Sequence, residues 1–191
     1  MEAKASDAGN TVKREPWARF FVKVALVLVV LYAAGSMFAA RYKVGITSQL
    51  NTCIPGYRFF LIDTQDITPE RDAIFAFRAK GITPLLEKGH KEIQPLIPYF
   101  ADGKILVKYI RGIPGDEVEV STEGVSVNDE VINKGLALAM SLNKKKEDFV
   151  RTRQLEEGQF WFAGSTFDSF DSRYWGSVST DQLIGRAYPL F

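Results

Sequence analysis

Cysteine and histidine are almost absent from this chain of 191 residues, which contains one of each, Cys53 and His90. A single cysteine excludes an internal disulfide, and one cysteine with one histidine offers few ligands for a zinc site. We therefore expect no metal and no other cofactor. By base rate a lone cysteine is more often a small buried apolar residue than a nucleophile. His90 lies among charged residues and glycine, which predicts a solvated loop.

An excess of charge is also lacking. The chain has 24 Lys and Arg against 23 Asp and Glu, a net charge of +1. Nucleic-acid binding proteins carry a basic footprint, so a nucleic-acid partner is not expected. The length suits one domain with a substantial core plus an appendage, and is too short for two full domains.

Charged residues are missing from 24–40, which is the longest apolar run of the chain. With Phe20 to Val22 included and Lys23 snorkelling, residues 20–40 are long enough for a transmembrane helix. A cleaved secretory signal is the alternative, because small residues occur at 35–40, but the run exceeds a usual signal h-region. Residues 1–19 are expected to form a tail, disordered over 1–15.

Basic residues flank this run unequally. Four precede its uncharged part and two follow it: Lys13, Arg14, Arg19 and Lys23 before, Arg41 and Lys43 after. By the positive-inside rule the N-terminus is then cytoplasmic, and residues 41–191 lie across the membrane.

Residues 41–191 show the pattern of a mainly β domain. Short runs rich in aromatic and β-branched residues predict strands at 57–63, 72–78, 104–110, 159–163 and 183–187. Alternation across 121–123 predicts a hairpin of 116–120 with 124–128. Two insertions interrupt the strands. Residues 83–100 contain three prolines and cannot be one regular helix, so they cap the core or touch the membrane surface. Residues 133–153 suit a short helix or an exposed insertion.

Lys108 is an ammonium among apolar residues. In a strand its side chain shares a face with Leu106 and Ile110. If that face is buried, the charged form is disfavoured and a neutral amine, which is a base, results. The alternative is that Lys108 snorkels to water at the rim of the sheet.

Three blocks of the sequence, taken in order, carry a resemblance to a known family. They are Cys53-Ile54-Pro55-Gly56; Lys108-Tyr109-Ile110-Arg111-Gly112-Ile113-Pro114-Gly115-Asp116; and Asp171-Ser172-Arg173-Tyr174-Trp175-Gly176, with Gly185-Arg186-Ala187 after it. With the preceding anchor, the chain resembles the membrane-bound type I signal peptidase family. Members of that family use a serine nucleophile and a lysine general base on a β-rich fold, which is the fold expected here behind a single N-terminal transmembrane helix.

The resemblance implies a role for each matching residue. Cys53 occupies the position of the nucleophilic serine, and Lys108 that of the general base. A thiol beside a neutral amine can become a thiolate that attacks a carbonyl and forms a thioester. Ser169 aligns with a serine that orients the lysine amine, or else it is a loop hydroxyl bonded to local backbone. Asp171 and Arg173, two positions apart, are expected to form a supporting ion pair.

Two departures from the family pattern leave alternatives open. The nucleophile position carries Cys53 instead of serine, so the enzyme uses a thiol, or Ser48 serves instead, or the activity is lost. Residues 164–166 read Gly-Ser-Thr where the family usually has Gly-Asp-Asn. This departure concerns the detail of that turn and not the pair of Cys53 and Lys108. The Cys53 backbone N–H and the Asn51 side chain are the candidate donors to an oxyanion.

The small size and compact nucleophile turn look more like the TraF-type peptidases of bacterial conjugation systems, which process pilus proteins. The resemblance implies that the substrate is a precursor protein with a pilin-like signal segment. It also implies two further partners, membrane lipid and conjugative secretion machinery. It places the catalytic domain in the periplasm, anchored in the bacterial inner membrane. Water or an amine could resolve the thioester, giving hydrolysis or cyclisation. The competing class is a non-catalytic, membrane-anchored assembly protein.

Overall fold

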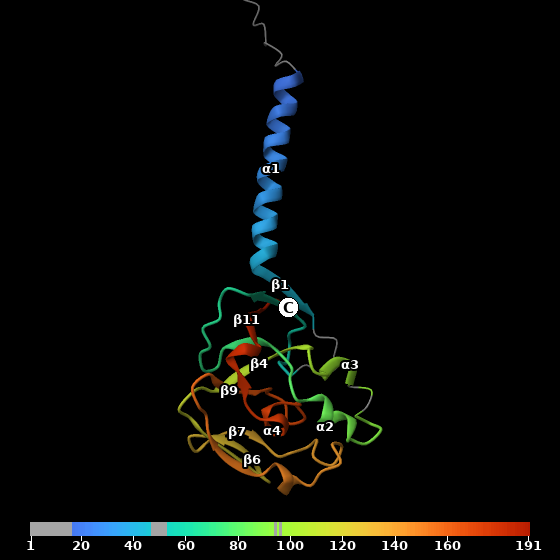
Figure 1. Ribbon diagram of the computed structural model, residues 1–191, viewed down its shortest axis with the longest axis vertical. Coiled ribbons are helices and arrows are strands. Elements are labelled where there is room, and N and C mark those ends of the chain that lie inside the picture. The colour runs from blue at the N-terminus through green and yellow to red at the C-terminus, as the bar shows by residue number, and fades with distance from the viewer. Residues whose placement is uncertain (1–16, 47–52, 94, 96) are drawn as a thin grey trace, which may run out of the picture. The chain divides into compact units, whose positions relative to one another are not determined.

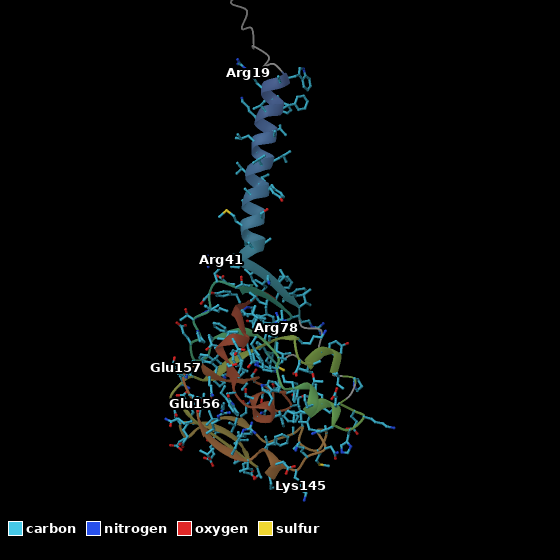
Figure 2. All side chains as sticks on the ribbon, viewed as in Figure 1. Arg19, Arg41, Arg78, Lys145, Glu156 and Glu157 are labelled. Carbon is cyan, nitrogen blue, oxygen red and sulfur yellow. The ribbon has the colours of Figure 1, made fainter. Side chains whose placement is uncertain are left out.

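A computed structural model describes residues 17–46, 53–93, 95 and 97–191. The chain divides into two units, Met1–Ala40 and Arg41–Phe191. The described part of the first unit is helical and belongs to α1 (Trp17–Arg41), and Figure 2 labels Arg19 and Arg41 near its two ends. The helix has 25 residues, and an 18-residue window within it has a mean hydropathy of 2.2, so α1 is long and apolar enough to cross a membrane.

The second unit contains a seven-stranded antiparallel sheet. Its strands are, in spatial order, β1 (Tyr42–Ile46), β2 (Phe59–Asp63), β11 (Leu183–Pro189), β3 (Ile74–Arg78), β4 (Ile105–Gly112), β9 (Gln159–Ala163) and β10 (Val178–Ser179). In this order the C-terminal strand, β11, lies between β2 and β3. Strands that are distant in sequence are therefore neighbours within the sheet, and Lys108 lies on one of its inner strands, β4.

A smaller antiparallel sheet has four strands, in the order β7 (Glu130–Lys134), β6 (Gly124–Val127), β5 (Glu117–Ser121) and β8 (Arg151–Gln154). In Figure 1 the labelled strands β6 and β7 lie at the opposite end of this unit from β1 and β11, beyond β4 and β9. β5 follows β4 after a short turn that ends at Asp116, and this turn connects the large sheet to the small one.

The helices of this unit are short. Within the described residues they include α2 (Thr83–Glu87), α3 (Ile97–Phe100), α4 (Ser172–Trp175) and the 3-10 turns η2 (Lys146–Phe149) and η3 (Thr180–Gln182). α2 begins with Pro84 in its first turn, where the missing N–H costs no helical hydrogen bond. α4 begins after Asp171, whose carboxylate accepts from the Arg173 N–H as an N-cap. Only α4 carries residues of the predicted site.

The main core lies against one face of the large sheet and includes the inner faces of the small sheet. Its large buried side chains include Phe75, Phe77, Ile110, Trp161 and Phe162. A second, smaller cluster covers the other face of the large sheet and is formed by Ile54, Phe60, Ile62, Ala76 and Ala187. Ile54 therefore ties the turn that follows Cys53 to the sheet.

The fold is mainly β, as the sequence predicts, and the predicted strand regions correspond to β2, β3, β4, β5, β6, β9 and β11. Four strands were not predicted: β1, β7, β8 and β10. The two α-helical turns of 83–100 agree with the absence of one regular helix there, and the side chains of Leu86, Ile93 and Phe100 enter the core. Contact of this loop with a membrane stays a prediction.

Residues 133–153 begin in β7, end in β8 and contribute Leu136, Ala139, Leu142 and Phe149 to the core. The segment is therefore not exposed throughout, and the helix described within it is short. Its connecting residues are turns and one 3-10 turn. The charged residues 144–148 are exposed, and Lys145 projects outward in Figure 2.

Candidate active site

Cys53 precedes a tight turn. The turn runs from Ile54 to Tyr57, whose N–H donates to the Ile54 carbonyl at 3.4 Å. Pro55 and Gly56 occupy its central positions, and Gly56 has a φ of 88°, the geometry that a type II turn requires of glycine. Ile54 is buried while Cys53 is half-buried. The turn thus fixes the backbone beside the thiol and leaves the side chain accessible.

The Cys53 carbonyl is held from the opposite side. It accepts two hydrogen bonds from Ser165, one from the backbone N–H at 2.9 Å and one from Oγ at 3.1 Å. Ser165 follows β9 by two residues. The Cys53 turn is therefore attached to the end of β9 by a residue 112 positions away in the sequence.

Lys108 lies at the middle of β4, where burial alternates along the strand. Its side chain is on the buried face with Leu106 and Ile110, and the residue is 1% exposed. Snorkelling is therefore excluded, since the amine does not reach water. Lys108 Nζ donates to Ser169 Oγ at 3.1 Å, and Ser169 is itself buried. Among the described residues no carboxylate lies within salt-bridge distance of Nζ.

Gly164 lies where these groups converge. A Cβ built on Gly164 would stand 2.2 Å from Ser169 Oγ and 2.9 Å from Cys53 Cβ. Real Cβ atoms do not approach other atoms so closely, so a side chain larger than hydrogen cannot be placed there without moving Cys53 or Ser169. Gly164 thus permits the close approach of Cys53 to Ser169, and through Ser169 to Lys108.

Asp171 and Arg173 form a fully buried ion pair beneath this group. Arg173 Nε lies 2.8 Å from Oδ1 of Asp171, and Nη2 lies 2.9 Å from Oδ2. Burial acts against the charged guanidinium, but the hydrogen bonds and charge of Asp171 outweigh it and raise the pKa of Arg173. The pair is not on one extended segment, because Asp171 is extended while Arg173 lies within α4.

The same ion pair organises the loop that carries Ser169. Arg173 donates to the carbonyls of Ser169 at 3.0 Å and Phe167 at 3.2 Å, and Asp171 accepts from the Gly164 N–H at 3.3 Å. These two residues therefore hold both the Ser169 loop and the end of β9, and neither lines the pocket in front of the thiol.

Cys53 and Lys108 line one pocket of about 280 Å³. Its walls are otherwise mostly apolar and come from β1, the Cys53 turn, β2, α3 and β4, including Val44, Ile46, Tyr57, Tyr99 and Phe100. No hydrogen bond joins Cys53 Sγ to Lys108 Nζ in this structure. The amine instead donates to Ser169 Oγ.

The structure brings together Cys53, Lys108 and Ser169, with Asp171 and Arg173 behind them. Ser48 and Asn51, the alternative nucleophile and the second oxyanion donor, lie outside the described residues. His90 is exposed, as the charged residues and glycine around it predict.

Sequence reasoning missed the positions of Gly164 and Ser165, which it treated only as a departure from a pattern. The available signal was a glycine directly after a buried strand, which often marks a close approach between backbones.

A buried amine without a carboxylate partner, a hydroxyl that bonds to it, and a half-buried thiol on the same apolar pocket suit base-assisted nucleophilic chemistry on a carbonyl compound. Such a site, in a mainly β unit that follows an apolar helix, is typical of a membrane-anchored hydrolase. The chain belongs to the family described as signal peptidase, peptidase S26, which matches residues 17–191.

Two known proteins illustrate the likeness. A probable signal peptidase I-2 from Synechocystis is 31% identical over 85 residues, which are 44% of this chain and 37% of that protein. The match thus spans little more than a third of the relative's length. A crystal structure of a signal peptidase I from Enterococcus faecalis covers 62% of this chain and 96% of its own, with 22% identity and a TM-score of 0.37.

Proposed function

We propose that this protein is a membrane-anchored endopeptidase in which Cys53 is the nucleophile and Lys108 the general base. The observation that carries the proposal is the environment of Lys108, which is 1% exposed and bonded to a neutral hydroxyl. A general base must be able to accept a proton, and among the described residues this amine bonds to a hydroxyl and has no carboxylate within salt-bridge distance.

The reaction proceeds in two stages. Lys108 Nζ takes the proton of the Cys53 thiol, and Sγ attacks the carbonyl carbon of the scissile peptide bond. The Cys53 backbone N–H donates to the oxyanion that forms. When the peptide C–N bond breaks, the protonated lysine gives its proton to the leaving amine, and a thioester remains on Cys53.

Water then resolves the thioester. Lys108 takes a proton from the water and the hydroxyl attacks the thioester carbonyl. The C–S bond then breaks and the protonated lysine returns its proton to Sγ, which regenerates the thiol and releases a carboxylic acid. An amine in place of water gives a new peptide bond, and attack by the substrate's own N-terminus gives cyclisation. The accessible thiol in an apolar pocket is compatible with either acceptor.

The remaining site residues act through these two. Ser169 orients the Lys108 amine by its hydroxyl. Asp171 and Arg173 are positioning residues, because they hold the Ser169 carbonyl and the Gly164 N–H without facing the pocket. The Asn51 side chain is proposed as the second oxyanion donor.

The substrate is an exported precursor protein, proposed here to be a pilin with a signal segment. An extended substrate can add as a strand beside the site, because β1 is the edge of the large sheet and lines the pocket. The TraF-type branch, association with conjugative secretion machinery, and an inner-membrane location with a periplasmic catalytic unit belong to the same proposal. α1 supports the anchored state by its length and hydropathy.

The intact mass of the precursor in cells tests this function. Wild-type protein should yield a product shortened at one bond, and a cyclic product would lack one further water. Lys108→Ala and Cys53→Ala should leave the precursor whole, whereas Cys53→Ser should retain partial processing because serine is the family's nucleophile. Ser48→Ala is the matched control and should process normally. Full processing by both Lys108→Ala and Cys53→Ala would support the assembly-protein alternative.

A further inference from the structure

Asn133 is a buried polar residue at the end of β7 that the proposed chemistry does not use. It is 9% exposed, and its Nδ2 donates to the Gly164 carbonyl at 2.9 Å across 31 positions of sequence. β7 belongs to the four-stranded sheet, which carries none of the five described candidate site residues. Asn133 is therefore a side-chain contact from the small sheet to the strand end beside the thiol.

The bond from Asn133 acts on one particular peptide group. The Gly164 carbonyl and the Ser165 N–H belong to the same planar unit and point in opposite directions. Asn133 holds the carbonyl side of this plane, while the N–H side donates to the Cys53 carbonyl at 2.9 Å. A rotation of the plane would therefore break both hydrogen bonds and release the Cys53 backbone.

The other half of the Asn133 amide has no partner. Oδ1 is buried and accepts no hydrogen bond within the described part of the chain. An unpaired buried acceptor costs stability, so a leucine of similar shape would suit this position at least as well if packing alone mattered. The amide orientation is set by its donor, since a flipped side chain would place Oδ1 against the Gly164 carbonyl oxygen.

The neighbouring backbone docks on the site as well. The carbonyl of Gly135 accepts from Arg173 Nη1 at 3.1 Å, and that of Lys134 at 3.4 Å. Residues 133–135 thus contact the site at two places, the ion pair and the Gly164 peptide. Within 133–135, Asn133 contributes its side chain, whereas Lys134 and Gly135 contribute backbone carbonyls. A substitution can therefore remove the Asn133 contact without altering the path of the backbone.

We propose that Asn133 is a positioning residue for the nucleophile. It fixes the plane of the peptide between Gly164 and Ser165, that plane fixes the Cys53 carbonyl, and the thiol is thereby held in reach of Lys108. This inference rests on the proposed function, because it assigns Asn133 an effect on the Cys53 and Lys108 pair.

The test compares Asn133→Leu with wild type in the full-length protein in detergent. We expect kcat for precursor processing to fall 10- to 100-fold with KM changed less than twofold, and the rate of Cys53 alkylation by iodoacetamide to fall in parallel. The melting temperature should stay within a few degrees, because the variant also removes the unpaired Oδ1. Unchanged kcat and alkylation in a folded variant would overturn the proposal.

Asn133→Asp gives a second readout that a packing role would not produce. A neutral carboxylic acid can donate to the Gly164 carbonyl, whereas a carboxylate cannot. The activity of this variant relative to wild type should therefore rise as the pH falls through the titration of the carboxyl group. A ratio that is constant with pH would contradict the proposal, and this test also decides the matter if Asn133→Leu does not fold.

Asn128→Gly, in the turn between β6 and β7, is the control. It removes the hydrogen bonds of Asn128 with Asp116 and with the Glu117 N–H and tolerates the positive φ of 50°. It should lower the melting temperature and leave kcat unchanged. Failure of the proposed function is distinguishable, because Lys108→Ala would then match wild type in processing and alkylation, whereas failure of this inference alone leaves that difference intact.

Discussion

Lys108 and Ser169 are joined by a hydrogen bond of 3.1 Å between Nζ and Oγ, and both residues are buried. They are 61 positions apart, one on the central strand β4 and the other in the loop after β9. A hydroxyl can orient an amine without holding a proton on it, which a carboxylate would do. The pairing is therefore compatible with a lysine that acts as a base.

Replacing Ser169 by alanine should slow processing about 10- to 100-fold, the loss expected when one hydrogen bond that positions a reacting group is removed. The measurement is kcat on purified protein. Ser172→Ala is the control, because its Oγ is equally buried and accepts from the Phe162 N–H without touching Lys108. It should lower stability and leave kcat unchanged. Equal loss of kcat in both variants would remove the special role of Ser169.

Gly164→Ala should abolish processing. The new methyl group would overlap Ser169 Oγ at 2.2 Å and Cys53 Cβ at 2.9 Å, so one of these residues must move. Overpacking of this kind costs about 1–3 kcal/mol, which thermal unfolding can detect. Gly35→Ala in α1 meets no atom within 4 Å and should behave as wild type. Normal processing by Gly164→Ala would show that the site tolerates a displaced Cys53 or Ser169.

Breaking the buried ion pair should destabilise the whole second unit. Asp171→Asn leaves the Arg173 guanidinium buried without its counter-charge, a change that costs about 3–5 kcal/mol. Urea unfolding followed by tryptophan fluorescence measures this loss. Arg173→Lys should also destabilise, because an ammonium cannot reproduce the planar donors that reach Asp171, Ser169 and Phe167. A loss below about 1 kcal/mol in Asp171→Asn would contradict the supporting role assigned to the pair.

Much of this arrangement follows from local sequence patterns. Strand alternation predicts that Lys108 shares a face with Leu106 and Ile110, and the structure shows that this face is the buried one. The Pro55 and Gly56 turn is likewise encoded locally, since it needs only a fixed φ and a glycine with positive φ.

The long-range contacts could not be predicted in this way. Asn133 meets Gly164 only because the small sheet folds back onto the end of β9, and no local periodicity reports that event. β8 is short and polar on its exposed side, and β10 has two residues, so neither shows a strand pattern. The leucines of 133–153 were assigned to a helix or to the surface because a buried turn has no characteristic period.

Asp116 should make the stability of the protein fall at acid pH. Burial acts to raise the pKa of its carboxyl, but hydrogen bonds from Arg71, the Ile113 N–H and Asn128 outweigh burial and lower it. Because the folded pKa lies below the unfolded one, the stabilisation is present above the unfolded value of about 4 and is lost as the pH falls through the folded value.

The variant Asp116→Asn should therefore lose about 1–2 kcal/mol at pH 7, a modest figure because Arg71 is partly exposed. As the pH falls below the unfolded value of about 4, its melting temperature should decline less than that of wild type. Asp129→Asn, at an exposed turn position with positive φ, is the control and should follow the wild-type curve. Parallel curves for Asp116→Asn and wild type would contradict this linkage.

The most direct test of the proposed dyad is the rate at which iodoacetamide alkylates the protein near neutral pH, measured by intact mass. Cys53 is the sole cysteine, so every modified thiol reports on the proposed nucleophile. With Lys108 acting as its base, wild type should react at least about 10-fold faster than Lys108→Ala, because only the thiolate is alkylated. Equal rates in the two proteins, with both folded, would contradict the assignment of Lys108 as the base that activates Cys53.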